Sequence, residues 1–307
     1  ELQRLVDYLT RDGKPDIIQL SNASIIGLAH QIKKKLDVKI VCSLLNEDDW
    51  INEMAEPYQS NAWKLISKEA VNVDALLTPS DYYKTLFISK TGITGKNFHV
   101  VHLGFDPGDL TNIEKRNNWP AVGYFCRISS QNGFDKLVDA FIELKSGNSL
   151  PGLTLHVSGG YTGDDKPFLA EQIRKIKVNG LKEFVRIYPE FHGSSKQEFF
   201  SNIDIMSVPV RKHDGYGLYL LEANAAGVPV VQPASGAFPE IIERTKGGIT
   251  YSPDTVAELS ANLLKLLMNN DLRSKLGEEG RENVLKKLSL AKMSEDLSEV
   301  YNGVMSK

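Results

Sequence analysis

Two glycines stand immediately before a strongly apolar segment, in a pattern that can bind an anion. Gly215 and Gly217 precede residues 218–226, whose composition predicts a helix, and Gly227 ends that helix before a buried strand. Small residues ahead of a helix let backbone N–H groups approach an anion closely, and the helix dipole favours negative charge there. The start of this helix is therefore a candidate anion site.

One acidic residue, Glu222, lies in the middle of this otherwise apolar helix. An ionised carboxylate that is buried without a partner costs a large amount of free energy, so Glu222 must have a partner. A pair of vicinal hydroxyls, such as those of a ribose, is one candidate. A structural salt bridge to a local lysine or arginine is the other, and the spacing alone favours neither.

Two further glycine-containing turns follow strands in the same half of the chain. Within residues 123–136, a predicted strand ends at Arg127 and a loop containing Gly133 leads into a helix. Within residues 156–160, another predicted strand ends at Gly159. Open α/β sheets bind ligands at the carboxyl ends of their strands, and the planar guanidinium of an arginine suits phosphate oxygens. An arginine in a loop can equally be solvated, but the three turns together favour a phosphate-bearing ligand.

Short β-branched segments alternate with longer helical ones along the chain, which is typical of βαβ units and a parallel sheet. In the first half, strands are expected over residues 16–20, 38–43, 74–77 and 98–103, and helices over 1–9, 25–36, 58–71 and from Ser80, a candidate N-cap. In the second half, strands are expected over 122–126, 153–158, 185–188, 205–208 and 228–232, and helices over 134–145, 167–177, 196–202 and 218–226. The chain beyond Tyr251 is predicted to be helical.

We therefore expect an α/β protein with two domains in series. Residues 1–104 form the first domain, 105–120 a linker, 121–288 the second domain and 289–307 a terminal helix. The first domain has about four predicted strands, fewer than a typical doubly wound sheet, and the sequence begins at Glu1 and not at methionine. Its leading strands are therefore expected to be missing, so that the first domain is incomplete.

Composition and charge exclude several classes of protein. The 307 residues are 41% hydrophobic and 24% charged, with a formal net charge of −3. This balance is typical of a globular protein and has no basic excess for nucleic-acid binding. No uninterrupted apolar run of about 18 residues is present to span a membrane. The run of lysines at 33–35 could assist peripheral contact with an anionic membrane, although it is shorter than a usual polybasic cluster.

Cysteine and histidine usage indicates a reducing compartment and no metal site. Cys42 and Cys126 lie far apart in apolar runs, which predicts two buried thiols and a cytoplasmic protein. None of the six histidines has a partner at metal-ligand spacing. We therefore expect neither a metal nor a separate cofactor.

Several segments resemble the retaining nucleotide-sugar glycosyltransferases of the GT4 family, which have the GT-B fold. The family's motif of two carboxylates separated by seven residues is matched by residues 214–222, followed by the family's Ala-Xaa-Ala-Ala-Gly-Xaa-Pro-Val-Val segment. Residues 235–240 resemble its Gly-Gly-Xaa-Pro-Glu turn, and residues 78–80 and 103–106 match landmarks of the first half. The resemblance implies two Rossmann-like, doubly wound domains that face a cleft, with the terminal helix, residues 291–304, packing back on the first domain.

The resemblance also implies residue roles. Glu222 would hold the ribose of a nucleoside-diphosphate sugar, Gly217 and Leu218 would offer backbone N–H groups to the diphosphate, and Asp214 would stand near the donor sugar. Arg127 would neutralise the leaving diphosphate in place of a metal. Asn132 and Gly133 would line the donor site, Gly159 would lie at the same rim, and the base would lie near Tyr188. The acceptor would be a sugar, glycan or lipid-linked hydroxyl, in polysaccharide or glycoconjugate synthesis. The protein would work in the cytoplasm or at the inner face of the membrane.

This chain departs from the family pattern at three places. The first family glutamate is Asp214 here, one methylene shorter, and the lysine expected five residues after Arg127 is Asn132. Arg211 or Lys212 could replace that lysine, or both could be solvated surface charges. These departures keep open an alternative, a catalytically weak or inactive nucleotide-sugar-binding protein.

The third departure is an acidic loop after the second predicted strand. Many relatives carry a histidine there, whereas this chain has Glu47, Asp48 and Trp50. The acidic residues could bind acceptor hydroxyls beside the flat face of Trp50, or they could belong to a hydrophilic loop that caps the next helix. A Rossmann-type oxidoreductase is disfavoured because no Gly-Xaa-Gly-Xaa-Xaa-Gly follows a first strand.

Overall fold

The computed structural model describes residues 2–95, 97–114, 116, 120–147, 149–188 and 190–306. The chain divides into two compact units: unit 1 comprises Glu1–Gly104 and Leu290–Lys307, and unit 2 comprises Phe105–Ser289. Residues 115 and 117–119 of the expected linker lie outside the described residues. An earlier part of that linker forms a 3₁₀ turn, Gly108–Asn112, within unit 2.

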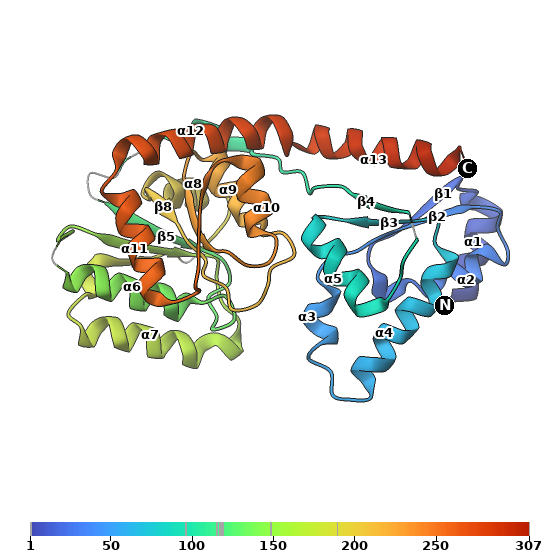
Figure 1. The fold of residues 1–307 in the computed structure, drawn as a ribbon, viewed down its shortest axis with the longest axis horizontal. Coiled ribbons are helices and arrows are strands. Elements are labelled where there is room, and N and C mark those ends of the chain that lie inside the picture. Colours follow the sequence, from blue (N-terminus) through green and yellow to red (C-terminus); the bar gives the residue numbers. More distant parts are fainter. Residues whose placement is uncertain are drawn as a thin grey trace. The chain divides into compact units, whose positions relative to one another are not determined.

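Unit 1 is built on a parallel sheet that has four strands within the described residues. These strands pair in sequence order and are β1 (Ile17–Leu20), β2 (Lys39–Ser43), β3 (Ala75–Thr78) and β4 (Phe98–Val100). The helices of this unit are α1 (Leu2–Tyr8), α2 (Leu28–Lys33), α3 (Glu47–Ile51), α4 (Tyr58–Glu69), α5 (Asp81–Thr91) and α13 (Leu290–Met305), labelled in Figure 1. The predicted cap is confirmed, because the Ser80 hydroxyl accepts a hydrogen bond from the Tyr83 N–H at 3.1 Å.

Both faces of the unit 1 sheet are buried. Alternate residues of a strand point to opposite faces, so β2 and β3 each supply two apolar surfaces. The residues on the side of α2, α4 and α5 are Ile40, Cys42 and Leu76, and those on the side of α13 are Val41, Ala75 and Leu77. Val300 and Val304 of α13 pack against the second set. The terminal helix is therefore part of the core of unit 1.

Unit 2 contains a parallel sheet with six strands among the described residues. The strands are β5 (Ala121–Phe125), β6 (Thr154–Ser158), β7 (Val185–Ile187), β8 (Ile205–Met206), β9 (Val230–Pro233) and β10 (Gly248–Tyr251), in the order β10-β9-β8-β5-β6-β7. The chain proceeds outward from β5 to β7 and then returns to β8 on the other side of β5. The sheet is therefore doubly wound, and the strand order reverses between β5 and β8, where open α/β sheets bind ligands at the carboxyl ends of the strands.

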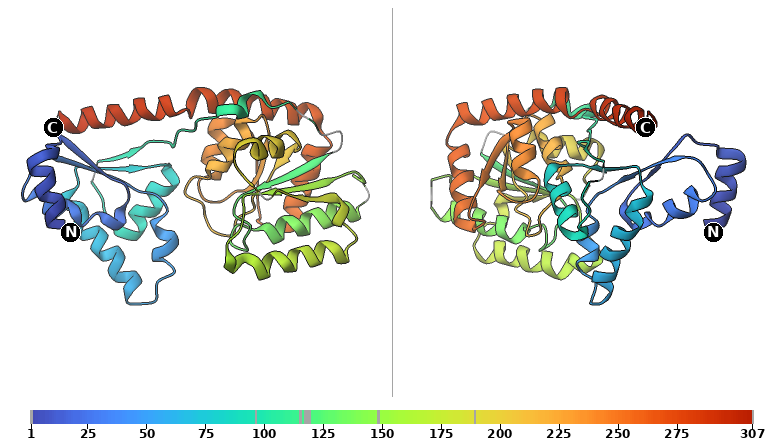
Figure 2. Two further views of the ribbon diagram at one scale, coloured as in Figure 1. Left: turned by 180° about the vertical axis from the view of Figure 1, so that it is seen from behind. Right: turned by 45° about the vertical axis from the view of Figure 1, so that its right-hand side comes forward.

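Helices cover both faces of this sheet. They are α6 (Phe134–Ser146), α7 (Lys166–Val178), α8 (Gly193–Ser201), α9 (Leu218–Ala225), α10 (Phe238–Thr245), α11 (Val256–Leu267) and α12 (Asn270–Lys287). Within unit 2, α6, α7 and α11 lie along one face and α8 and α9 along the other, with α12 against α9 and α10 (Figures 1 and 2). Every residue of β5 is buried, as expected for a strand covered on both sides.

The structure confirms the predicted parallel-sheet α/β fold and corrects several elements. The sequence analysis missed α3, α10 and β10, because the first is a single acidic turn and the other two are short. The strand predicted over residues 205–208 has only two residues in ladder pairing. In the described part of the chain, no helix combines the length and apolar character that a membrane span requires.

Candidate functional site

Three of the predicted site residues gather at the carboxyl end of β5, beside the reversal of strand order. Cys126 follows this strand, and its thiol interacts electrostatically with Arg127, Asp214 and Glu222. Burial, together with the negative charges of Asp214 and Glu222, raises the pKa of the Cys126 thiol to about 12. Both cysteines are free thiols, as predicted, but Cys126 is only half-buried.

Asp214 is oriented by the residues that lead into α9. Its Oδ1 accepts a hydrogen bond from the Tyr216 N–H at 2.8 Å, and its Oδ2 accepts one from the Tyr219 hydroxyl at 3.3 Å. Burial, and then the charge of Asp214, raise the pKa of Tyr219 well above its ordinary value, so this hydroxyl keeps its proton. The carboxylate is therefore fixed at the helix start with a known donor on each oxygen.

Helix α9 begins at the candidate anion site. Gly217 precedes its first residue and has a left-handed backbone, with a φ of +81°. A Cβ atom at this position would lie 2.8 Å from the Phe238 ring, so a larger residue would force this aromatic side chain to move. Leu218 is 44% exposed, and the first N–H groups of any helix have no acceptor within the helix. An anion can therefore use these donors.

Glu222 has an internal partner, which was one of the two alternatives left open by the sequence. Lys196 of α8 forms an ion pair with Oε1 of Glu222, and the two side chains are 23% and 18% exposed. The second oxygen, Oε2, has no hydrogen-bond partner among the described residues. The carboxylate is therefore half satisfied by the protein, and it is not sealed from solvent.

Arg127 is also paired. Its Nε donates to Oδ2 of Asp165 at 2.8 Å, and its Nη2 donates to Oδ1 of Asp165 at 3.2 Å and to the Thr162 hydroxyl at 2.9 Å. The Arg127 side chain is 53% exposed, whereas that of Asp165 is 10% exposed. Arg127, which is predicted to bind the diphosphate, therefore has a guanidinium that a buried acid already orients.

The predicted loop residues Asn132, Gly133 and Gly159 shape the ends of β5 and β6. The Asn132 side-chain amide donates to the Arg127 carbonyl at 2.9 Å, so it stabilises the loop and supplies no positive charge. A Cβ atom at Gly133 would lie 1.9 Å from the Pro209 carbonyl oxygen, and one at Gly159 would lie 2.2 Å from the Cys126 carbonyl oxygen. These two glycines are required because neighbouring loops pass close to each other.

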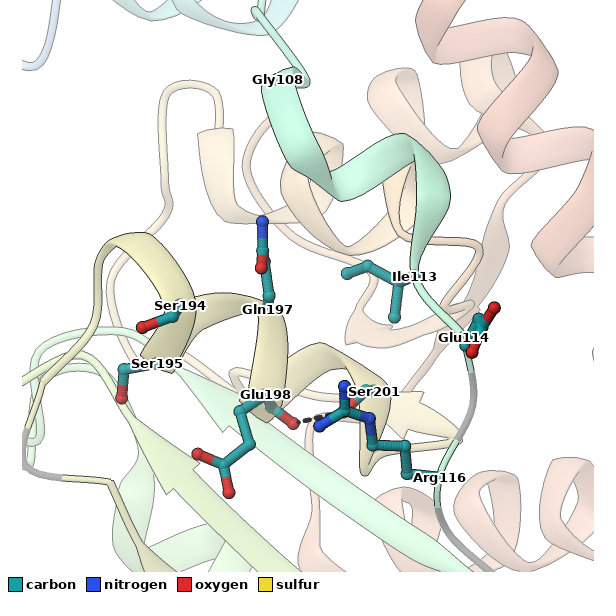
Figure 3. A pocket seen from close by; sticks show the side chains of 9 residues that line it. All are labelled: Gly108, Ile113, Glu114, Arg116, Ser194, Ser195, Gln197, Glu198 and Ser201. Carbon is teal, nitrogen blue, oxygen red and sulfur yellow. Dashed lines mark hydrogen bonds between the residues drawn. The ribbon is translucent and has the colours of Figure 1, made fainter.

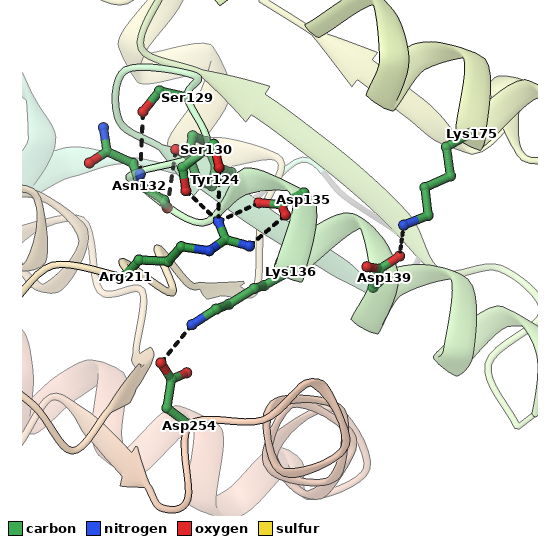
Figure 4. Close-up of polar contacts among 10 residues, drawn as sticks. All are labelled: Tyr124, Ser129, Ser130, Asn132, Asp135, Lys136, Asp139, Lys175, Arg211 and Asp254. Carbon is green, nitrogen blue, oxygen red and sulfur yellow. Dashed lines mark hydrogen bonds and ion pairs between the residues drawn. The ribbon is translucent and has the colours of Figure 1, made fainter. Parts of the chain in front are cut away.

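Arg211 does not replace the missing lysine. Its guanidinium contacts both carboxylate oxygens of Asp135, at 2.7 and 2.6 Å, and the Ser130 carbonyl oxygen (Figure 4). The hydrogen bonds from Arg211 hold the pKa of Asp135 below its usual value against the opposing effect of burial. The expectation of a solvated or phosphate-binding Arg211 is thus corrected: this side chain ties the loop between β8 and α9 to the start of α6.

Tyr188 is not an exposed platform for a base. Its side chain is only 4% exposed, its ring packs edge-on against Phe199, and its hydroxyl lies 3.0 Å from Nδ1 of His156. The base of the donor nucleotide was predicted to lie near the end of β7. Only the backbone and other residues of that turn could contact it there, because the Tyr188 ring is part of the core.

Glu47 is a structural residue, which corrects its prediction as an acceptor ligand. It is 1% exposed, and its carboxylate accepts hydrogen bonds from the N–H groups of Ala23 and Leu45, both at 2.8 Å, and from the Tyr83 hydroxyl at 2.7 Å. Its capacity is used within unit 1, so it cannot bind a substrate hydroxyl. Asp48 is partly exposed, and Trp50, on the same short helix, is 42% exposed.

A separate polar pocket of about 580 Å³ lies within unit 2 between α8 and the 3₁₀ turn that precedes β5 (Figure 3). Its lining residues are Gly108, Ile113, Glu114, Arg116, Ser194, Ser195, Gln197, Glu198 and Ser201. None of them was singled out by the sequence. Glu198 is paired with Arg186 at 2.5 Å, so its carboxylate already has a partner within unit 2.

Residues 111–283 match the family described as Glycosyl transferases group 1. The chain belongs to this family. The sequence is 27% identical over 187 residues to the GDP-mannose-dependent alpha-(1-6)-phosphatidylinositol monomannoside mannosyltransferase of Mycobacterium tuberculosis, a match that covers 58% of this chain and 46% of that protein. It is 32% identical over 148 residues to the lipopolysaccharide core biosynthesis mannosyltransferase LpsB of Rhizobium meliloti, covering 48% of this chain and 39% of LpsB.

Solved structures share the fold of this chain. The Anabaena protein HepE in complex with UDP has a TM-score of 0.84 and 16% sequence identity, over 98% of this chain and 82% of HepE. These likenesses confirm the GT-B fold predicted from the motifs. The chain spans about half the length of the two curated relatives.

Two residues of the candidate site were missed by the sequence analysis. Lys196 was foreseen only as an unspecified local cation. Asp165 could have been found, because Thr162 and Asp165 have the spacing of a capping box, which places an acid at the carboxyl edge of the sheet. In the described ranges, no group of three histidine, cysteine, aspartate or glutamate side chains could hold a metal ion.

Proposed function

We propose that the chain acts in the transfer of a sugar from a nucleoside-diphosphate sugar to a hydroxyl acceptor, with retention of configuration. The observation that carries this proposal is the meeting of Arg127, Asp214 and Glu222 around Cys126, where the strand order of unit 2 reverses. Two carboxylates and one guanidinium at this edge suit a ligand that has hydroxyls at one end and phosphate at the other. Retention is inferred from the resemblance of residues 214–222 to the retaining family.

Each residue has a role in this proposal. Oε2 of Glu222 accepts a hydrogen bond from a ribose hydroxyl while Lys196 holds Oε1. The N–H groups at Gly217 and Leu218 bind the diphosphate, and Arg127 stabilises the negative charge that develops on it as the sugar leaves. Asp214 binds a hydroxyl of the donor sugar. Catalysis is then mainly electrostatic, which agrees with the expectation that no metal is needed.

The acceptor is proposed to bind unit 1 near Asp48 and Trp50. An exposed indole offers a flat apolar face to a sugar ring, and the nearby carboxylate can accept hydrogen bonds from hydroxyls. The name of the Mycobacterium tuberculosis relative specifies a GDP-mannose donor and a phosphatidylinositol monomannoside acceptor. We therefore place GDP-mannose first among donors and a lipid-linked glycan first among acceptors, and action at the inner face of the membrane follows from such an acceptor.

A binding experiment with two variants tests the donor site. Calorimetry with GDP-mannose, UDP-glucose and ADP-glucose should find one donor that binds the wild-type chain and raises its melting temperature by mass action. E222A should weaken that donor by about tenfold or more, the effect of losing a charge-assisted hydrogen bond. K196M is the matched control, because it removes the ion pair but leaves Glu222 available, so donor affinity should be kept or should rise.

Two possible roles of Glu222, binding the donor and only forming the ion pair, predict different results for E222A and K196M. If the glutamate serves only the ion pair, E222A and K196M will lower stability similarly and leave donor affinity unchanged, which would remove Glu222 from the donor site. Absence of binding by all three donors would count against the proposed function itself.

One observation favours the alternative of a nucleotide-sugar-binding protein with little activity. The position of the expected lysine is filled by Asn132, whose amide is used by the Arg127 carbonyl, and Arg211 is held by Asp135. A transfer assay with the donor that binds and a panel of sugar and lipid-linked acceptors separates the two. Tight binding without transfer or hydrolysis would favour the alternative.

A further inference from the structure

The Arg127 guanidinium is held along one edge only. Asp165 and Thr162 take its Nε and Nη2 hydrogens, and no described residue accepts a hydrogen bond from Nη1. A guanidinium is planar and rigid, so fixing the Nε and Nη2 edge also fixes the direction of the two Nη1 hydrogens. The side chain is thus oriented at one edge and has free donors at the other.

Asp165 is itself rigidly placed. Its Oδ2 accepts from the Thr162 N–H and the Thr162 hydroxyl, both at 2.8 Å, in a capping box at the turn Gly163–Asp165 that leads into α7. The hydrogen bond from Arg127 is the main cause that lowers the pKa of Asp165 to about 2. The carboxylate is therefore ionised at any ordinary pH, and it is anchored to a loop at the end of β6 while Arg127 follows β5.

We propose that Asp165 is a positioning residue for the donor diphosphate, which it serves by holding Arg127 with Nη1 directed at the phosphate oxygens. This inference rests on the proposed function, because it assumes that a nucleoside diphosphate binds beside Arg127. Neither the motifs of the sequence nor the named relatives point to Asp165. The acid makes no contact with substrate, and its effect passes through the arginine.

If Asp165 acted through its charge alone, removing that charge would change diphosphate affinity in the opposite direction. A carboxylate beside an anion site repels the incoming diphosphate, so removing its charge should strengthen binding if Asp165 merely neutralises Arg127. Positioning predicts weaker binding, because a mobile arginine must lose side-chain entropy when it binds phosphate. The sign of the change therefore separates the two effects.

The test compares D165N with D164N in the full chain. Asparagine keeps an oxygen for the Thr162 N–H but cannot accept from both Arg127 nitrogens, so the cap survives and the clamp is lost. Asp164 is exposed in the same turn, and its carboxylate has no hydrogen bond to Arg127, so D164N removes an equal charge without touching the clamp. The probes are UDP and GDP, each beside its nucleoside, uridine or guanosine, with dissociation constants measured by calorimetry.

For the diphosphate that the wild type binds, D165N should raise the dissociation constant by about tenfold and leave that of the nucleoside unchanged. D164N should leave the dissociation constant of the diphosphate unchanged or slightly lower it. T162V, which removes one hydroxyl of the clamp, should shift diphosphate affinity in the same direction as D165N by about threefold. In an R127M background, D165N should have no further effect, because its action passes through the arginine.

Three results would overturn the inference. These are tighter diphosphate binding by D165N, an equal loss of nucleoside and diphosphate affinity, and an undiminished effect of D165N in the R127M background. If the wild-type chain binds neither UDP nor GDP, the proposed function fails and the inference fails with it. Wild-type binding that D165N leaves unchanged defeats the inference alone.

Discussion

Two glutamates in apolar surroundings, Glu47 in unit 1 and Glu222 in unit 2, are satisfied in different ways. Glu47 is 1% exposed and accepts hydrogen bonds from two backbone N–H groups and a tyrosine hydroxyl. Glu222 is paired with Lys196 through one oxygen, and its side chain remains 18% exposed. A carboxylate beside apolar residues thus requires a partner, but its spacing in the sequence does not say whether that partner belongs to the protein.

The difference identifies which acid can serve a ligand. All the contacts of Glu47 are made by residues of its own unit, so the acid holds the loop after β2 in place. Glu222 keeps an oxygen without a partner among the described residues and lies near Asp214 and Arg127 around Cys126. Residual exposure and unused hydrogen-bonding capacity, and not acidity, mark the candidate ligand.

The largest effect is expected for E47A. Removing this carboxylate leaves the buried Ala23 N–H, the partly buried Leu45 N–H and the Tyr83 hydroxyl without an acceptor, so the free energy of unfolding should fall by about 3 kcal/mol or more. Urea unfolding of E47A measures the loss. D48N on the same helix is the control and should change stability by about 0.5 kcal/mol at most. If E47A changed the free energy of unfolding only slightly, Glu47 and Glu222 would not differ in their structural role.

Asp165 extends the comparison to an acid that is both buried and paired with a cation. Its pKa is lowered to about 2, mainly by the hydrogen bond from Arg127. A lowered folded-state pKa stabilises the fold above the unfolded value of about 4, and this stability is lost as the pH falls towards 2. Because the arginine is half-exposed, solvent screens the ion pair. We therefore expect it to contribute about 1 kcal/mol to the free energy of unfolding.

Urea unfolding at pH 7, 4, 3 and 2 measures this contribution. D165N should be less stable than the wild type at pH 7, and the difference should shrink as the pH falls to 2, because the wild-type carboxyl becomes protonated as the pH approaches its pKa. Parallel loss of stability by the two proteins across this range would contradict the assignment.

E222A and K196M should change stability less than E47A. The ion pair is partly exposed, so each variant should lower the free energy of unfolding by about 1 kcal/mol or less. The double variant E222A/K196M, measured by the same unfolding method, should cost no more than either single variant. A loss as large as that of E47A would show that Glu222 is a structural residue of the same kind.

The smallest stability effect is expected for W50A. Its indole is 42% exposed, so its loss should change the free energy of unfolding by about 0.5 kcal/mol or less. If Trp50 contacts the acceptor, W50A should raise the KM for acceptor in a transfer assay and leave the affinity for donor unchanged. W63F is a useful comparison, because Trp63 is buried and packs edge-on against Phe87, so this change should affect stability and not KM.

Much of the fold could be predicted because burial on both faces of a parallel sheet leaves a direct mark on the sequence. Continuous apolar runs such as Ala121–Phe125, followed by amphipathic segments such as Phe134–Ser146, fix the strands and helices of unit 2. The acidic turn Glu47–Ile51 and the strand Gly248–Tyr251 could not be predicted, because tertiary contacts stabilise them and local propensity does not.

The site was predicted less completely, because residue type does not reveal pairing. The motif predicted Asp214 and Glu222 as site residues, and the structure brings both within electrostatic range of Cys126. The partners of Glu222 and Arg127, which are Lys196 and Asp165, come from segments 26 and 38 residues away in sequence. Tyr188 was placed at the correct strand end but is turned into the core, which only the packing of His156 and Phe199 determines.

The position of α13 has a consequence for biosynthesis. Unit 1 consists of two stretches of chain, and unit 2 is the insertion between them. Val300 and Val304 cover one face of the unit 1 sheet, yet they leave the ribosome after all of unit 2. The core of unit 1 is therefore completed only after unit 2 has been translated, and the nascent chain must keep an apolar sheet face from aggregating until α13 emerges.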